Sequence, residues 1–281
     1  MAGSQMQPYS TLKVKKEDGV VWITFDNPPV NLLSLEMIQE IDALSHELAR
    51  DTQSRVAVFQ SANPEFFIAH ADVDLIRRLP PTDLRPLELN IYVAALERIR
   101  ALPMASIGKI EGIARGGGSE FLLSLDMRFA AIGPTKLGQP EVALGIFPSG
   151  SGSQNLPRIL GRARALEVAL GCHDFTAEEA ERYGYINRAL PRDQLSDFVD
   201  RLAKRITSFP RAAIAATKRA FDYRDATVTG TGGLLEEQHL FNQTRVTSEA
   251  QIRMAKFMEL GAQTREGELN LDAIIRTLTD A

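Results

Sequence analysis

The sequence predicts an α/β fold in which short strands alternate with helices, followed by a helical C-terminal region. The alternation is visible up to about residue 190, where apolar β-type runs bounded by turn residues take turns with apolar residues at helical spacing. From Arg211 onward the spacing is mostly helical. A length of 281 residues with 44% hydrophobic content is enough for one large domain, or for a domain with an appendage.

The first sixty residues predict two strands, a helix and a third strand. The two strands, over Thr11–Lys16 and Val20–Phe25, flank a turn that contains Gly19. Ser34 has the chemistry of an N-cap for an amphipathic helix that runs to about Arg50. The apolar run over 55–60 then predicts a compact strand.

The middle of the chain continues the alternation after prolines 80, 81 and 86, which break regular structure. The predicted elements are a helix over about 87–101, a buried strand over 105–113, a helix that begins at the glycines before Glu120, a strand over 126–131 and an extended piece over 136–141. A helix runs from the loop over 144–153 toward Leu170, a capping box lies at 176–179, and another helix precedes Pro210.

The stretch Gly116-Gly117-Gly118-Ser119-Glu120 is the first candidate for chemistry. Glycine lets a bound group approach the backbone closely, and the first N–H groups of a helix have no intrahelical partner. Together these features can hold an anionic oxygen, with Glu120 beside it as an acid or a base. The alternative is an ordinary turn whose acidic residue only complements the helix dipole.

Glu141 is the second acidic candidate, 21 positions after Glu120, in the run Gln139-Pro140-Glu141. A helix followed by a strand that turns back can bring these two positions together. Two carboxylates that face one cavity can divide acid and base work if their surroundings differ. Acidic residues are abundant in the chain, so an unrelated pair is the alternative.

Other classes of site find no support in the sequence. There is no Gly-x-Ser-x-Gly elbow, no complete dinucleotide fingerprint and no HExxH motif, and the four histidines form no Cys/His cluster, so we expect no metal. A net charge of −4 does not suggest a nucleic-acid partner. The single cysteine, Cys172, allows no internal disulfide, the N-terminal residues are polar, and no apolar run reaches membrane-spanning length. We expect a cytoplasmic protein.

Several stretches, taken in order, resemble the enoyl-CoA hydratase/isomerase (crotonase) family. They are Asn27-Pro28-Pro29-Val30-Asn31, Ala69-His70-Ala71-Asp72, Gly116-Gly117-Gly118-Ser119-Glu120, Gly138-Gln139-Pro140-Glu141 and Thr176-Ala177-Glu178-Glu179-Ala180. The resemblance covers about Val20 to Pro210. It implies a crotonase-like spiral of strand-strand-helix units over residues 1–208. It also implies a helical region over 209–281 that forms a homotrimer, or a hexamer as a dimer of trimers.

The same resemblance implies an enzyme that acts on an acyl-CoA thioester, with no cofactor besides the coenzyme A of the substrate. Its oxyanion hole would use the N–H groups of Ala69 and Gly117. Glu120 would act as base and Glu141 as acid, which implies hydration of a 2-enoyl-CoA by a hydro-lyase of fatty acid metabolism. The residues expected to contact substrate are Ala69, His70, Ala71, Asp72, Gly116 and Gly117.

His70 departs from the family pattern, which usually has a glycine after the first oxyanion-hole alanine. A side chain there adds bulk near the thioester, or a further acid or base. Sister reactions therefore stay open, namely isomerisation, decarboxylation or thioester hydrolysis. A non-catalytic acyl-CoA-binding homologue is a further alternative, although the presence of both glutamates argues against it.

Overall fold

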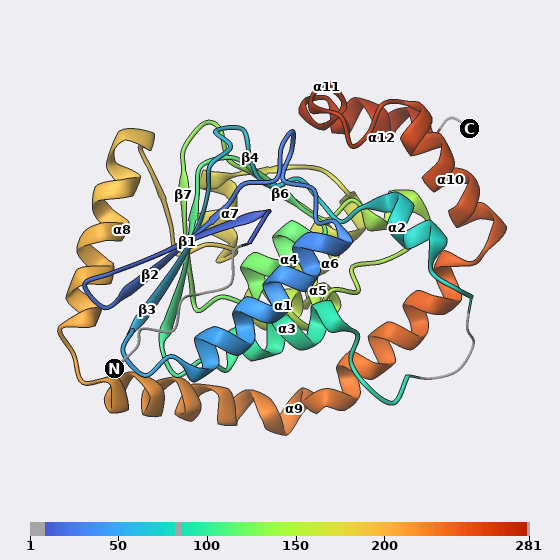
Figure 1. Cartoon of the computed structure of the whole chain (residues 1–281). Coiled ribbons are helices and arrows are strands. Elements are labelled where there is room, and N and C mark those ends of the chain that lie inside the picture. Colours follow the sequence, from blue (N-terminus) through green and yellow to red (C-terminus); the bar gives the residue numbers. More distant parts are fainter. Residues whose placement is uncertain (1–8, 82–85, 280–281) are drawn as a thin grey trace.

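The protein folds into two β-sheets covered by helices, as seen in a computed structural model that describes residues 9–81 and 86–279 (Figure 1). The polar residues 1–8 and residues 82–85 of the proline-rich segment lie outside the described residues. The first sheet contains, in spatial order, β1 (Leu12–Glu17), β2 (Val20–Phe25), β3 (Val56–Ser61), β5 (Ala105–Ile110), β7 (Met127–Ala131) and β10 (Arg188–Leu190). The second contains β4 (Phe66–Ile68), β6 (Ile113–Arg115), β8 (Lys136–Gly138) and β9 (Phe175–Thr176).

The chain passes from the first sheet to the second three times in succession, through β3 and β4, β5 and β6, and β7 and β8. Each pair of strands is followed by helices. They are α2 (Val73–Arg78) and α3 (Ile91–Arg100), then α4 (Gly117–Leu123), then η1 (Glu141–Leu144), α5 (Gly152–Leu160) and α6 (Arg162–Gly171). This repetition confirms the α/β fold class and the spiral of strand-strand-helix units.

Helices cover both faces of the six-stranded sheet. Figure 1 shows α8 (Arg192–Thr207) on one side and α1 (Leu35–Arg50), α3 and α4 on the other. Side chains alternate along a strand, so Val21 and Ile23 of β2 pack toward α1, whereas Val20 packs toward Leu195 and Val199 of α8. The near-continuous apolar runs of these strands follow from this double burial.

Three predicted boundaries are wrong, each for a local reason. The single strand expected over 105–113 is two strands in different sheets. The chain turns between them at Gly112, which packs so closely on another backbone that a Cβ there would lie 2.5 Å from the Glu65 carbonyl. The helix expected from 87 begins at Ile91, since the Asn90 side chain accepts from Val93 N at 2.9 Å. The helix expected to reach Leu170 divides at Gly161, whose φ is +78°.

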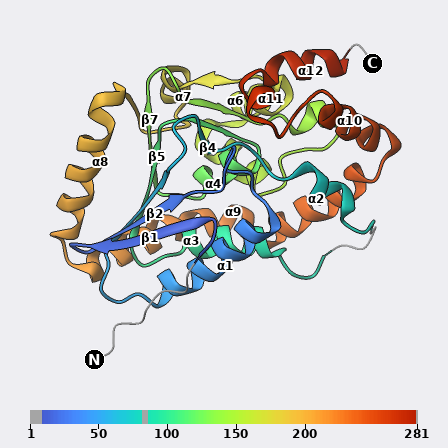
Figure 2. The ribbon, with the colours of Figure 1, turned by 45° about the horizontal axis from the view of Figure 1, so that its top comes forward.

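The C-terminal region is helical, as predicted, and consists of α9 (Arg211–Arg245), α10 (Ser248–Glu259), α11 (Arg265–Leu269) and α12 (Leu271–Thr279). Figure 1 shows α9 along the lower edge of the view, and both Figure 1 and Figure 2 show α10 returning beside α2. Met254 and Phe257 of α10 pack with Val73, the first residue of α2, and with Ile146 in the loop after η1. The region therefore closes over one end of the core, and its role in forming trimers stays a prediction.

Candidate active site

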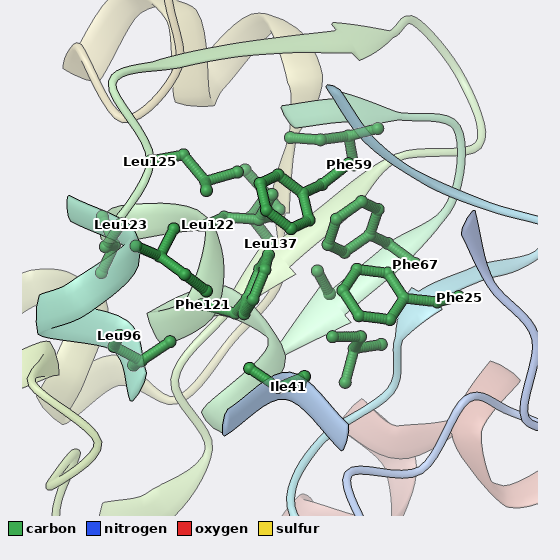
Figure 3. Packing of buried hydrophobic residues seen from close by; sticks show 14 of the residues in the cluster. Phe25, Ile41, Phe59, Phe67, Leu96, Phe121, Leu122, Leu123, Leu125 and Leu137 are labelled. Atoms are coloured by element: carbon green, nitrogen blue, oxygen red, sulfur yellow. The ribbon is translucent and has the colours of Figure 1, made fainter. Parts of the chain in front are cut away.

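Helix α4 positions Glu120 from inside the core. All seven of its residues are buried. Phe121, the next residue, packs edge-on against Phe25 and Phe59 at 5.2 and 5.1 Å between ring centroids (Figure 3). A Cβ on Gly118 would lie 2.8 Å from Ile68 Cβ, so the helix rests directly on β4. Because its neighbours on both sides are packed, the backbone at Glu120 has little freedom to move.

The Glu120 carboxylate is surrounded by the loop that follows η1. Its side chain is buried, and Oε1 accepts a hydrogen bond of 2.9 Å from the Gly152 N–H. A Cβ on Gly152 would lie 2.6 Å from the same oxygen, and a Cβ on Gly150 would overlap the other. These two glycines leave the space that the carboxylate occupies. Sequence analysis did not predict this role.

Glu141 is held at the start of η1, after the proline that ends the extended piece. It is buried, and with the Gln139 side-chain amide turned so that its nitrogen faces Glu141, that nitrogen donates to both carboxylate oxygens, at 3.2 and 3.1 Å. Gly116 passes close by, since a Cβ on it would lie 2.7 Å from Glu141 Oε1. The glycine turn before α4 therefore makes room for the second carboxylate.

The two carboxylates line one cavity of about 240 Å³ together with Gly117 and Ala71. The predicted meeting of Glu120 and Glu141 is thus present in the structure. The rest of the wall is largely apolar and comes from five parts of the chain, with Leu33, Leu35, Ile38, Leu75, Ile76, Leu79, Ile91, Tyr92, Ile146, Phe147 and Phe241. Such a cavity, apolar with a few converging polar groups, is typical of a site for a small organic ligand.

Gly117 presents its backbone to this cavity. It is the first residue of α4, where an N–H has no partner within the helix, and it follows Gly116 with φ of +48°. Its carbonyl accepts a hydrogen bond of 2.7 Å from the Tyr92 hydroxyl. An N–H in this position, at the positive end of the helix dipole, is suited to hold an oxyanion.

The amide expected from Ala69 has another partner. The Ala69 N–H donates to the Val30 carbonyl at 3.2 Å, and the residue is fully buried. Ala71, two positions later, is better placed. Its nitrogen lies 3.5 Å from where a Cβ on Gly117 would be, and the His70 carbonyl of the same peptide accepts from Leu33 N at 3.0 Å. Because N–H and C=O of a trans peptide point in opposite directions, the Ala71 N–H points away from Leu33.

His70 and Asp72, both expected to contact substrate, have structural partners. The His70 ring is buried, with Nε2 2.7 Å from Glu268 Oε1 in α11. Asp72 borders the cavity but caps α2, because its Oδ1 accepts from Asp74 N at 2.9 Å. Of the expected contact residues, Gly117, Ala71 and Asp72 line the cavity.

Tyr92 is a site residue that sequence reasoning missed. Burial and the nearby Glu120 charge raise the pKa of Tyr92 well above its usual value, so its hydroxyl stays a hydrogen-bond donor. Helical spacing puts position 92 on the same buried face as Leu96. A hydroxyl group on the buried face of a helix is the feature of the sequence that could have indicated this residue.

Two further features concern metal binding and membranes. Within residues 9–81 and 86–279, no group of three or more His, Cys, Asp and Glu side chains is arranged to hold a metal ion. The helices of the same ranges include none with the length and apolar character that crossing a membrane requires. Cys172 is buried and not bonded to another cysteine.

Comparison with known proteins agrees with the fold. The family model for enoyl-CoA hydratase/isomerase matches residues 15–266. A probable enoyl-CoA hydratase of Mycobacterium leprae is 33% identical over 252 residues, which are 89% of this chain and 96% of that protein. A short-chain-enoyl-CoA hydratase of Clostridium acetobutylicum is 27% identical over 247 residues, 88% of this chain and 94% of that one.

A solved structure is similar over almost the whole length. The crystal structure of a putative enoyl-CoA hydratase from Streptomyces avermitilis superposes with a TM-score of 0.87 at 40% identity, and the match covers 98% of this chain and 100% of the other. The glycine turn, the two buried glutamates and the spiral fold lie within the matched region. The chain therefore belongs to the enoyl-CoA hydratase/isomerase family.

Proposed function

We propose that this protein is an enoyl-CoA hydratase, which adds water across the 2,3 double bond of a 2-enoyl-CoA. The observation that carries the proposal is that two buried carboxylates, Glu120 and Glu141, line one apolar cavity beside the backbone of Gly117 and Ala71. Two relatives support it, since both are matched over almost their whole length and are described as enoyl-CoA hydratases. The reaction needs the thioester, water and these groups, and no cofactor.

In the proposed mechanism, the N–H groups of Gly117 and Ala71 donate to the thioester oxygen. Glu120 takes a proton from a water molecule as the water oxygen bonds to C3. The electron pair of the double bond moves toward the thioester oxygen, which becomes an enolate oxygen held by the two N–H groups. Glu141 then gives a proton to C2, and the product is a 3-hydroxyacyl-CoA.

Two features favour hydration over the sister reactions. Both carboxylates are present and buried at the same cavity, which supplies a base for water and an acid for C2. The His70 ring, which would otherwise suggest a different acid or base, points toward Glu268. A double-bond isomerase in which one carboxylate moves a proton between carbons is the second candidate, and the family description includes it.

The test is the pair of variants Glu120→Gln and Glu141→Gln. Glutamine keeps the shape and an acceptor oxygen but cannot exchange the proton, so we expect each variant to lose at least about 100-fold in kcat. The assay follows the loss of conjugated enoyl-thioester absorbance. Glu178→Gln, on the exposed side of α7 (Ala177–Tyr183), is the matched control and should retain full activity. Folded variants that both keep near-wild-type rates would contradict the mechanism.

A further inference from the structure

The His70 side chain has a hydrogen-bond acceptor at each ring nitrogen. Nδ1 lies 2.8 Å from the Ala71 carbonyl oxygen, and Nε2 lies 2.7 Å from Glu268 Oε1. A carbonyl only accepts, and an ionised carboxylate only accepts. Both ring nitrogens must therefore carry hydrogen when Glu268 is ionised, which makes His70 an imidazolium.

The surroundings of Glu268 favour its ionised form. The side chain is fully buried, and Oε1 also accepts from the Gln263 N–H at 2.8 Å. Arg115 Nη1 lies 3.5 Å from Oε2 and donates to the Glu268 carbonyl at 2.8 Å. Burial alone would raise the pKa of Glu268, but the charge and hydrogen bond of His70, the Gln263 N–H and Arg115 together lower it.

His70 is affected in the complementary direction. Burial acts to lower its pKa, but the charge and hydrogen bond of Glu268 and the Ala71 carbonyl outweigh burial and raise the pKa above its usual value. The other charged groups near the ring are Arg115, which opposes the shift, and Glu141, which lies across Gly116. From α10 the uncharged ring of Phe257 lies beside it, at 5.9 Å between centroids. The Asp174 carboxylate accepts two hydrogen bonds of 2.7 Å from the Arg115 guanidinium.

These contacts fix the backbone on both sides of the Ala71 N–H. The His70 carbonyl accepts from Leu33 N at 3.0 Å, and Asp72 N donates to the Leu33 carbonyl at 3.2 Å. The Ala71 carbonyl accepts from the His70 ring. Each peptide group that includes an atom of Ala71 is thereby bonded to a buried partner, so the direction of the Ala71 N–H is set by them.

The C-terminal region forms hydrogen bonds to this loop through the side chains of Glu268 and Gln263. Besides Glu268, the Gln263 side chain accepts from Val73 N at 2.5 Å and donates to Asp72 Oδ1 at 3.3 Å. A Cβ on Gly267 would lie 2.6 Å from the Gly261 carbonyl carbon, so the backbone that carries Glu268 is itself closely packed. The loop that provides Ala71 is therefore anchored to a segment almost 200 residues away in sequence.

We propose that His70 and Glu268 are positioning residues, in which the charged ring of His70 ties the Ala71 carbonyl to α11 and so keeps the Ala71 N–H aimed at the thioester oxygen. This inference rests on the proposed function, because it assigns the pair to the same oxyanion hole. Neither side chain touches the reacting atoms. The expected result of disturbing the pair is a loss in kcat with little change in KM.

The test uses variants that each break one contact. His70→Asn keeps an amide donor near the Nδ1 position and loses Glu268, whereas His70→Gln reaches toward Glu268 and loses the Ala71 carbonyl. Glu268→Gln keeps the shape but removes the charge. We expect each to lower kcat about 10-fold, with KM within about twofold, since small displacements of a donor cost this much or more. The control is Arg265→Gln, which breaks only the exposed contact of α11 with Glu65 and should behave as wild type.

A second readout depends on binding and not on turnover. A 3-oxoacyl-CoA forms an enolate whose negative oxygen occupies the oxyanion hole, and the enolate is measured by its ultraviolet absorbance. We expect the bound enolate fraction to fall in the three variants in proportion to kcat. If the wild type fails to hydrate any enoyl-CoA while these variants still lose bound enolate, the proposed function is wrong and the positioning pair stands.

The pH profile provides the third readout. The imidazolium loses its proton as pH rises through the raised pKa of His70, so wild-type kcat should fall on the alkaline side, and Glu268→Gln should move that fall to lower pH. The proposal is overturned if the variants only lower the melting temperature, with kcat, bound enolate and pH profile unchanged well below it. Full activity in His70→Asn or Glu268→Gln would also overturn it, because Glu268 would then have no part in positioning.

Discussion

At the scale of single residues, the site depends on glycines as much as on the two glutamates. Gly150 and Gly152 leave the space for the Glu120 carboxylate, and Gly116 leaves it for Glu141. Glu120 accepts from a backbone N–H, whereas Glu141 accepts from the Gln139 amide. The two carboxylates therefore have different partners at the same cavity, which is the arrangement that lets one act as base and the other as acid.

The hydroxyl of Tyr92 offers a test at this scale. Tyr92→Phe removes the hydrogen bond of 2.7 Å to the Gly117 carbonyl, and a hydrogen bond of this kind contributes about 1 kcal/mol. We expect kcat to fall about fivefold, which is that energy expressed as a rate. Tyr183→Phe is the matched control, since the Tyr183 hydroxyl donates to Glu167 at an exposed position. Equal rates for the two variants would show that Tyr92 does not support the Gly117 backbone.

The sequence was sufficient to predict that Glu120, Glu141 and the Gly117 backbone meet at one cavity, because each lies in a motif that resembles the family pattern, and their catalytic roles stay predictions. It was insufficient to choose between Ala69 and Ala71. Both are small residues in the same extended run, and the direction of their N–H groups is decided by Val30 and Leu33, which belong to another segment. The partner of His70 was also out of reach, since Glu268 is 198 positions away.

At the scale of elements, the structure depends on contacts between segments that are distant in sequence. Helix α4 follows directly from its pattern of glycines and apolar residues, but its burial depends on β4, a three-residue strand that sequence analysis did not predict. Short strands such as β4, β9 and β10 carry too few residues to show a period of two. Helix α11 has five residues, which is too short for a helix to be stable alone, so it depends on tertiary contacts such as those with the loop before α2.

The ion pair between that loop and α11 predicts how stability varies with pH. A raised pKa at His70 contributes stability that is complete below its unfolded value of about 6.5 and is lost as pH rises through the folded value. A lowered pKa at Glu268 contributes stability that is complete above about 4.5 and is lost as pH falls through the folded value. The free energy of unfolding of wild type minus that of His70→Asn should therefore be largest between about pH 4.5 and 6.5. A difference that is constant from acid to alkaline pH would contradict the charged pair.

At the scale of the whole molecule, the C-terminal region completes the enclosure of the site. Phe241 of α9 lines the cavity, α10 packs on α2 and η1, and α11 holds the loop of Ala71 (Figures 1 and 2). Sequence analysis predicted the helical content of this region from its spacing but expected it to serve the assembly of trimers. Its contacts with the site come from side chains such as Gln263 and Glu268, which no local pattern distinguishes from surface residues.

The central claim is that two carboxylates and two backbone N–H groups add water to an enoyl thioester. The most direct measurement is to give the purified wild-type protein 2-enoyl-CoAs of short, medium and aromatic type, and to follow the conjugated absorbance and the mass of the product. We predict rapid loss of absorbance with at least one substrate and a product that has gained one water molecule while keeping its thioester. A product of unchanged mass, or free coenzyme A, would contradict hydration and indicate an isomerase or a thioester hydrolase.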